Sequence, residues 1–172
     1  MLAAGAPTSL PLPDTFRFRL PEITFSENFT LHAGDHTFEI IGMPGHTACQ
    51  TVVYFPEERV LFAGDTIANR KVPSLHEALP FEWLDSLRKL QKLDCEIVVP
   101  GHGNLGGPAL IATYRAYFEL ATRRVDELRA AALSEAAIVD RVGAELLELH
   151  PDWQNRNWAT KTVEDLTWPA RA

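Results

Sequence analysis

Residues 50–66 have the sequence QTVVYFPEERVLFAGDT, and this stretch decides the fold. Its two β-rich runs, at 50–55 and 59–63, flank Pro56-Glu57-Glu58 as the strands of a hairpin flank their turn. A glycine, an aspartate and a threonine follow the second run directly, at 64–66. The stretch therefore predicts two neighbouring strands, with a polar turn at the end of the second.

Similar patterns extend the prediction along the chain. Alternating or β-rich runs predict further strands at 15–19, 22–25, 36–41 and 96–99. Apolar residues at three- and four-residue spacing predict helices at 80–92, 108–128, 134–150 and 159–166. The order predicts an α/β (α+β) domain in which helices cover a sheet. We divide the chain into 1–107, which carries the strands and their turns, and 108–172, a C-terminal helical extension packed on the same domain.

Composition narrows the class of protein. The chain has 172 residues, 46% of them hydrophobic, which suits one globular domain. A net charge of -7 without any run of Lys or Arg argues against nucleic acid or an anionic membrane as the main partner and favours a small-molecule substrate. No apolar run approaches a membrane span, and the first residues lack the pattern of a secretory signal, so we expect a cytoplasmic protein. Two separated cysteines, Cys49 and Cys95, predict neither a disulfide framework nor a zinc ribbon.

Three predicted turns contain the candidate metal-ligating residues. Pro-Gly-His-Thr at 44–47, Gly-Asp-Thr at 64–66 and Pro-Gly-His-Gly at 100–103 each come after a predicted strand. Glycine permits a sharp turn and a close backbone approach, and ligand sites gather at the carboxyl ends of strands, so we expect His46, Asp65 and His102 to converge. Two imidazoles and a carboxylate suit zinc above all, with Fe or Mn as alternatives. The carboxylate could bridge two ions, or the three groups could hold one ion with an open position.

Other candidate residues are less informative. His32 and His36 flank a predicted turn at Gly34, His76 lies in a polar loop, and His150 stands at a helix end, so none of the four is predicted to bind metal. Cys49 is a weak candidate for a soft ligand. Phe81 and Trp83 could line a pocket, although core packing is the preferred role, as it is for the aromatic residues of the long helix. Those residues are Tyr114, Tyr117 and Phe118.

Residues 37–107 carry GMPGHT, RVLFAGDT and VVPGHG in that order, and this set resembles the second half of a metallo-β-lactamase-fold hydrolase. The resemblance implies an αββα sandwich, of which this chain would furnish the later sheet, its covering helices and a C-terminal helical tail. It implies that His46 serves a first metal ion, that Asp65 bridges two ions and that His102 serves the second. It also implies that zinc, one or two ions in the full-length form, activates a water molecule to attack the substrate.

The sequence departs from the family pattern upstream. The family's His-x-His-x-Asp-His signature has no counterpart, because His32 and His36 have neither its spacing nor the helix start that follows it. We therefore expect Met1 to be an internal methionine, and the chain to be the carboxyl-terminal portion of a longer protein, weakly active or inactive by itself.

Three functions remain open at the level of sequence. The first is a zinc-dependent hydrolase that cleaves an ester, thioester, lactone or similar bond. The second is a non-catalytic binding or assembly module that retains half of the hydrolase fold, with an uncovered sheet face available to a partner. The third is a metal-storage or metal-sensing domain. A homodimer formed through the C-terminal helices is a further expectation.

Overall fold

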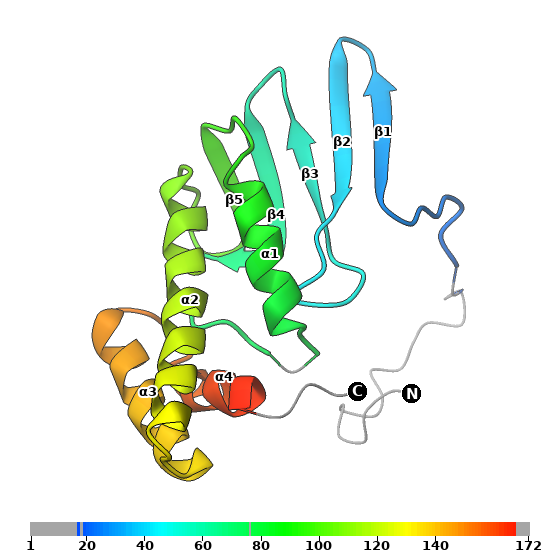
Figure 1. Ribbon diagram of the computed structural model, residues 1–172. Coiled ribbons are helices and arrows are strands. Elements are labelled where there is room, and N and C mark those ends of the chain that lie inside the picture. Colours follow the sequence, from blue (N-terminus) through cyan, green and yellow to red (C-terminus); the bar gives the residue numbers. More distant parts are fainter. Residues whose placement is uncertain (1–16, 18, 76, 168–172) are drawn as a thin grey trace.

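The computed structural model describes residues 17, 19–75 and 77–167, and within them it confirms a mixed α/β domain with one five-stranded sheet (Figure 1). The strands are β1 (Asn28–Ala33), β2 (His36–Gly42), β3 (Thr51–Phe55), β4 (Val60–Ala68) and β5 (Ile97–His102). The helices are α1 (Pro80–Leu90), α2 (Ala109–Ala130), α3 (Glu135–Leu149) and α4 (Trp158–Thr167).

The sheet joins an antiparallel part to a parallel one. Strands β1 to β4 follow each other in space as they do in the chain, each antiparallel to the next, whereas β5 lies parallel to β4. A parallel pair needs a crossover connection, and α1 lies in it, on one face of the sheet (Figure 1). The parallel pair therefore brings the C-terminal ends of β4 and β5 to the same edge.

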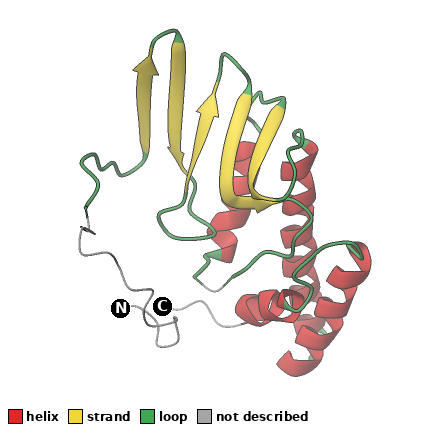
Figure 2. Cartoon of the chain, turned by 180° about the vertical axis from the view of Figure 1, so that it is seen from behind, coloured by secondary structure: helices red, strands yellow, loops and turns green. Residues whose placement is uncertain are grey.

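The two faces of the sheet have different surroundings. On one face, Val52, Tyr54 and Leu61 are buried beneath the helices. On the other face, the rings of Phe38, Phe55 and Phe62 form a row, with centroids 4.4 and 5.2 Å apart. Figure 2 shows the sheet in front of the helices, so no helix of the described chain covers this face.

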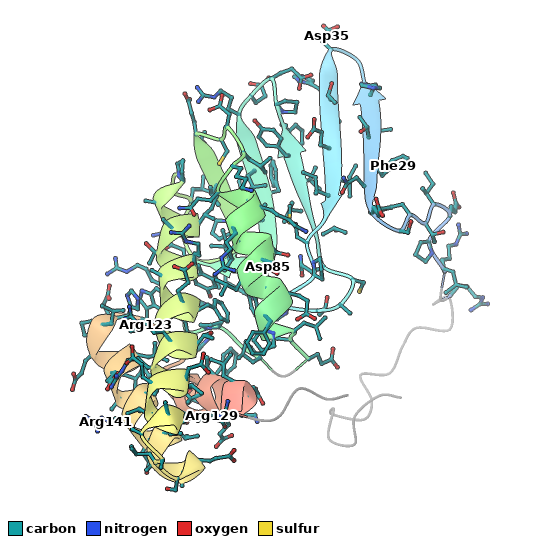
Figure 3. All side chains as sticks on the ribbon, in the orientation of Figure 1. Phe29, Asp35, Asp85, Arg123, Arg129 and Arg141 are labelled. Atoms are coloured by element: carbon teal, nitrogen blue, oxygen red, sulfur yellow. The ribbon has the colours of Figure 1, made fainter. Side chains whose placement is uncertain are left out.

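One buried cluster joins the sheet to all four helices. It includes Leu61, Leu87, Phe118, Ile138 and Val163, one residue from β4 and one from each helix. The aromatic residues of α2 that the sequence assigns to the core are buried, which confirms that prediction: they are Tyr114, Tyr117 and Phe118. Charged residues lie on the outer sides of α2 and α3, where Arg123 and Arg141 point away from the sheet (Figure 3).

Helix ends agree with the sequence patterns at several places. Ser134 is the N-cap of α3, and its side chain accepts a hydrogen bond of 3.3 Å from the Ala137 amide. Helix α4 buries Val163 and Leu166 against the core, whereas Trp158 at its start is partly exposed. None of the helices in the described part of the chain is long and apolar enough to cross a membrane.

Two predicted strands require correction. Residues 22–25 form no strand, and the neighbouring strand is β1, which the sequence analysis missed. Strand β1 pairs with β2 around the Gly34 turn, where Gly34 has a φ of 63°, so the turn was predicted but its first strand was not. The predicted strand at 15–19 falls largely outside the described residues, and Arg17 and Arg19 lie in no strand.

Replacement of Leu61 by Ala tests the assignment of the two sheet faces. Leu61 is fully buried, so its truncation should leave a cavity and lower the free energy of unfolding by about 2–5 kcal/mol. Phe62→Ala, on the opposite face of the same strand, should cost about 1 kcal/mol or less, because Phe62 is 44% exposed. Urea denaturation of both variants measures the difference, and equal losses would contradict the assignment.

The pH dependence of stability should carry a contribution from His150. Its ring stacks on Trp153 at 3.8 Å, and burial lowers its pKa from the ordinary value of 6.5. The unfolded chain therefore binds this proton more readily, and stability should be lost as the pH falls below about 6.5. His150→Phe keeps the stacked ring without the titration, so its urea midpoint should fall less between about pH 7 and pH 5. Parallel pH profiles for the two proteins would contradict this role.

Candidate active site

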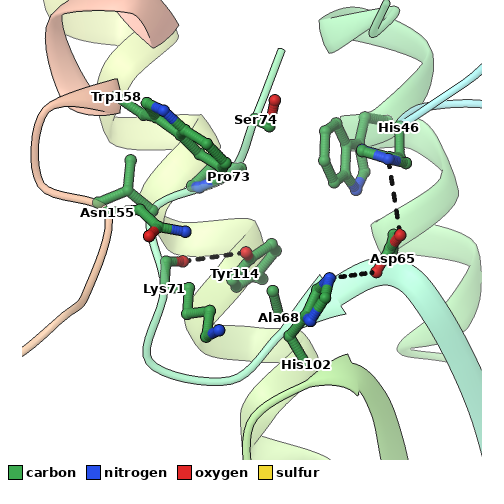
Figure 4. Close-up of a pocket in the computed structure, with 12 residues that line it drawn as sticks. His46, Asp65, Ala68, Lys71, Pro73, Ser74, His102, Tyr114, Asn155 and Trp158 are labelled. Carbon is green, nitrogen blue, oxygen red and sulfur yellow. Dashed lines mark hydrogen bonds and ion pairs between the residues drawn. The ribbon is translucent and has the colours of Figure 1, made fainter. Parts of the chain in front are cut away.

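Three side chains predicted from separate turns meet at the edge of the sheet. The Asp65 carboxylate lies between two imidazoles, with Oδ2 3.8 Å from Nε2 of His46 and Oδ1 3.3 Å from Nε2 of His102 (Figure 4). His46 comes from the loop between β2 and β3, Asp65 from β4, and His102 from the end of β5. We call these three residues the His–Asp–His trio.

The strands do not end where the sequence suggested. Asp65 lies within β4, and Pro100, Gly101 and His102 lie within β5, so the predicted turn at 64–66 and the first three residues of the predicted turn at 100–103 are strand segments. The pairing shifts there: Phe62 pairs with Val99, Gly64 with Pro100 and Ala68 with His102. Because proline has no amide hydrogen, Pro100 cannot donate to a ladder, and it sits where the register is irregular. This register shift changes the direction in which side chains point, and both strands continue through it.

Two glycines make the approach of these segments possible. A Cβ atom on Gly101 would overlap the Asp65 carboxylate and lie 2.8 Å from the Asp65 amide nitrogen. A Cβ atom on Gly45 would lie 2.7 Å from the Trp83 side chain. The glycine before each histidine therefore permits a close contact that a larger residue would prevent.

Helix α1 holds the loop of His46 in place. The Trp83 indole donates a hydrogen bond of 3.0 Å to the Thr66 carbonyl, and its ring lies edge-on to the His46 ring at a centroid distance of 5.5 Å. The Ser86 hydroxyl donates to the Pro44 carbonyl at 2.7 Å, and the Leu79 amide donates to the Gly45 carbonyl at the same distance. Trp83 thus fills both roles considered for it, since it is buried in the core and also lines the site.

A cavity of about 330 Å³ opens beside the trio. The sequence analysis missed most of its remaining wall, which includes Lys71, Ser74, Tyr114, Asn155 and Trp158. The Tyr114 hydroxyl donates to the Lys71 carbonyl at 3.0 Å, and burial raises its pKa far above the ordinary value, so it stays protonated. No motif marks Asn155 or Trp158, because only folding brings the start of α4 and the residues before it to this cavity.

The other candidates lie apart from the trio or outside the description. His32 and His36 belong to the β1–β2 hairpin, where they contact Thr37 and Glu58. Cys49 is exposed, and its sulfur lies 3.8 Å from the Thr47 hydroxyl. His76 is outside the described residues, and Phe81 is exposed without lining the cavity.

The trio fits zinc in donor type and falls short in donor number. Imidazole nitrogen and carboxylate oxygen are both ligands that zinc takes. However, His46 and His102 face different oxygens of Asp65, so each side offers one nitrogen and one oxygen, whereas catalytic zinc takes three protein ligands. Across residues 17, 19–75 and 77–167, no three or more His, Cys, Asp and Glu side chains form a group that could hold a metal ion.

Comparison with known proteins gives one family model, described as the metallo-beta-lactamase superfamily, which matches residues 3–102. A hydroxyacylglutathione hydrolase of Bartonella henselae is 40% identical over 80 residues, 46% of this chain and 32% of that protein. One of Francisella tularensis subsp. tularensis is 33% identical over 117 residues, 64% of this chain and 46% of that protein. The chain thus spans less than half the length of these curated relatives.

Solved structures agree with the family match. A metallo-beta-lactamase from Pontibacter korlensis superposes with a TM-score of 0.53 at 27% identity, covering 58% of this chain and 49% of that one. The structure of TMB-1 superposes with a TM-score of 0.50 at 30% identity, covering 58% of this chain and 47% of that one. Both the resemblance and the fold class inferred from the sequence are confirmed.

Replacement of Gly101 by Ala tests the close approach at Asp65. The added methyl group has no room, so the variant should lose about 1–3 kcal/mol of stability, and its crystal structure should show Asp65 displaced from His102. Gly107→Ala is the matched control, because a Cβ atom there meets only the Glu96 carbonyl at 3.5 Å, an ordinary contact. Unchanged stability and geometry in the Gly101→Ala variant would show that the glycine is dispensable.

Proposed function

Because the chain belongs to the metallo-beta-lactamase superfamily, we propose that the His–Asp–His trio is part of the metal centre of a thioester hydrolase. The observation that carries the proposal is the Asp65 carboxylate, which turns one oxygen to each of two imidazoles from different parts of the chain. A carboxylate in that position can be shared by two ions, with His46 beside one and His102 beside the other. Zinc is the metal we propose, with Fe or Mn as the alternatives.

The chain's own residues have defined tasks in this proposal. Zinc bound at the trio would activate water near neutral pH and would polarise the substrate carbonyl. Asp65 faces both imidazoles and would orient them, the Ser86 hydroxyl holds the His46 loop through the Pro44 carbonyl, and the Trp83 ring packs against that loop. The three donors are too few for two ions, so efficient turnover requires protein donors beyond the trio.

Thioesters are the substrate class we propose, with esters and lactones as the alternatives. Hydroxyacylglutathione hydrolases are among the relatives that share 33–40% identity with this chain. The cavity beside the trio, at about 330 Å³, has the size of a small-molecule site. A cytoplasmic location is part of the proposal and agrees with the free thiols of Cys49 and Cys95.

Metal analysis of the purified chain tests the trio. Removal of a side chain that only hydrogen-bonds a metal ligand lowers metal affinity by about tenfold or more. Asp65→Asn alters a proposed ligand itself, so it should weaken zinc binding by more than about tenfold. His46→Gln and His102→Gln should each have a smaller effect, since each removes a donor to one ion only. His36→Gln, on the β1–β2 hairpin, is the control and should bind zinc as the unaltered chain does. Equal and small effects of all four changes would contradict the proposal.

Hydrolysis assays separate the three functions that the sequence left open. S-lactoylglutathione, a phenyl ester and a lactone serve as substrates, each assayed with added zinc and with a chelator. Because three donors are too few for efficient turnover, slow zinc-dependent cleavage that Asp65→Asn reduces more than either His variant is the expected result. Zinc binding without cleavage of any substrate favours a storage or sensing domain, whereas absence of both favours the non-catalytic binding module.

A further inference from the structure

We infer that Asn69 is a positioning residue for His102, whose imidazole it aims at Asp65 through two hydrogen bonds to the backbone that leaves β5. Asn69 directly follows β4, and His102 is the last residue of β5. The inference deepens the proposed function, because it takes His102 as a ligand of the proposed metal centre. Its geometric part, the direction of the His102 ring, is independent of metal and can be tested without it.

Two hydrogen bonds join Asn69 to the chain at the end of β5. The Asn69 backbone amide donates to the His102 carbonyl at 2.8 Å, and the Asn69 side-chain amide donates to the Asn104 carbonyl at 2.8 Å. Gly103 lies between the two accepting residues and has a φ of 86°. A Cβ atom on Gly103 would lie 2.4 Å from the Asn69 carbonyl oxygen, so a larger residue would force the two segments apart. The backbone on both sides of Gly103 is therefore held against Asn69.

The contact between His102 and Asp65 is too weak to fix the ring by itself. The His102 side chain is 59% exposed, and its Nε2 lies 3.3 Å from Oδ1 of Asp65. An exposed pair at this distance contributes little, because solvent screens it and ordering two side chains costs entropy. The backbone that carries the ring must therefore supply most of the precision that a ligand needs.

Asn69 is itself anchored to the core. It lies in a tight turn after β4, in which the Lys71 amide donates to the Ala68 carbonyl at 3.2 Å. The buried Tyr114 of α2 donates from its hydroxyl to the Lys71 carbonyl at 3.0 Å and so ties this turn to the helix. Asn69 is therefore a fixed support for His102, as a positioning residue must be.

The rotamer of His102 in the metal-free protein tests the inference directly. Asn69→Ala removes the side-chain hydrogen bond and keeps the backbone one, so the chain should stay folded. Three-bond couplings measured by NMR with EDTA present should indicate one χ1 rotamer for His102 in the unaltered protein and an average over several in the variant. The couplings of His46, which another loop carries, should not change. Equal couplings of His102 in the two proteins would overturn the inference.

Zinc affinity shows whether Asn69 acts through His102. Asn69→Ala should weaken zinc binding by up to about tenfold, the lower end for loss of a group that supports a ligand, and by no more than His102→Gln does. In a His102→Gln background the same change should have little further effect, because the side chain that Asn69 positions is already absent. In a His46→Gln background the loss should persist. Equal losses in both backgrounds would indicate a general structural effect and would also overturn the inference.

Asn28→Ala is the matched control. Asn28 also bonds to the backbone through its side chain, accepting from the Gly42 amide at 3.4 Å, but it lies on the edge strand β1. The change should affect neither the couplings of His102 nor zinc binding. If the unaltered chain binds no zinc, the metal-centre proposal fails, and the couplings of His102 still decide the inference.

Discussion

The close parallel contact of β4 and β5 at Asp65 and Gly101 is the constraint on which the rest of the site depends. Gly101 has no side chain, so the Asp65 carboxylate can lie directly against the β5 backbone with His102 as the next residue. The same pairing requires a crossover, and α1 in that crossover packs Trp83 against the loop of His46 and bonds Ser86 to it. One strand pair therefore sets the positions of all three members of the trio.

Core and site share residues instead of lying in separate regions. Trp83 is buried against Phe118 of α2, at a ring distance of 5.0 Å, and also donates to the Thr66 carbonyl one residue after Asp65. Tyr114 packs in the same aromatic group and bonds to the Lys71 backbone. Because close-packed interiors transmit displacement, a change in the packing of α2 should be felt at both walls of the cavity.

The sequence predicted the trio and most of the sheet because both depend on local signals. A β-rich run followed by a glycine and a histidine is visible in the residues themselves, as it is at His46 and His102. Strand β1 escaped notice because five of its six residues are exposed and its stability comes from pairing with β2, which leaves no clear alternation. The positions of Asn155 and Trp158 in the cavity wall were not predicted for a different reason. They lie near Lys71 because backbone hydrogen bonds join segments that are distant in the sequence.

Stability alone does not account for the trio. Its contacts are 3.3 and 3.8 Å long, and the side chains of Asp65 and His102 are 43% and 59% exposed, so such pairs contribute about 1 kcal/mol or less. The backbone around them is unfavourable by comparison: Gly64 and Gly103 have φ values of 51° and 86°, and each glycine gives up more conformational entropy on folding than another residue would. Two of the three segments thus adopt restricted conformations to bring together groups that attract each other weakly. A ligand bound between these side chains would stabilise an arrangement that their own contacts stabilise only weakly. This is the physical reason to look for function at Asp65.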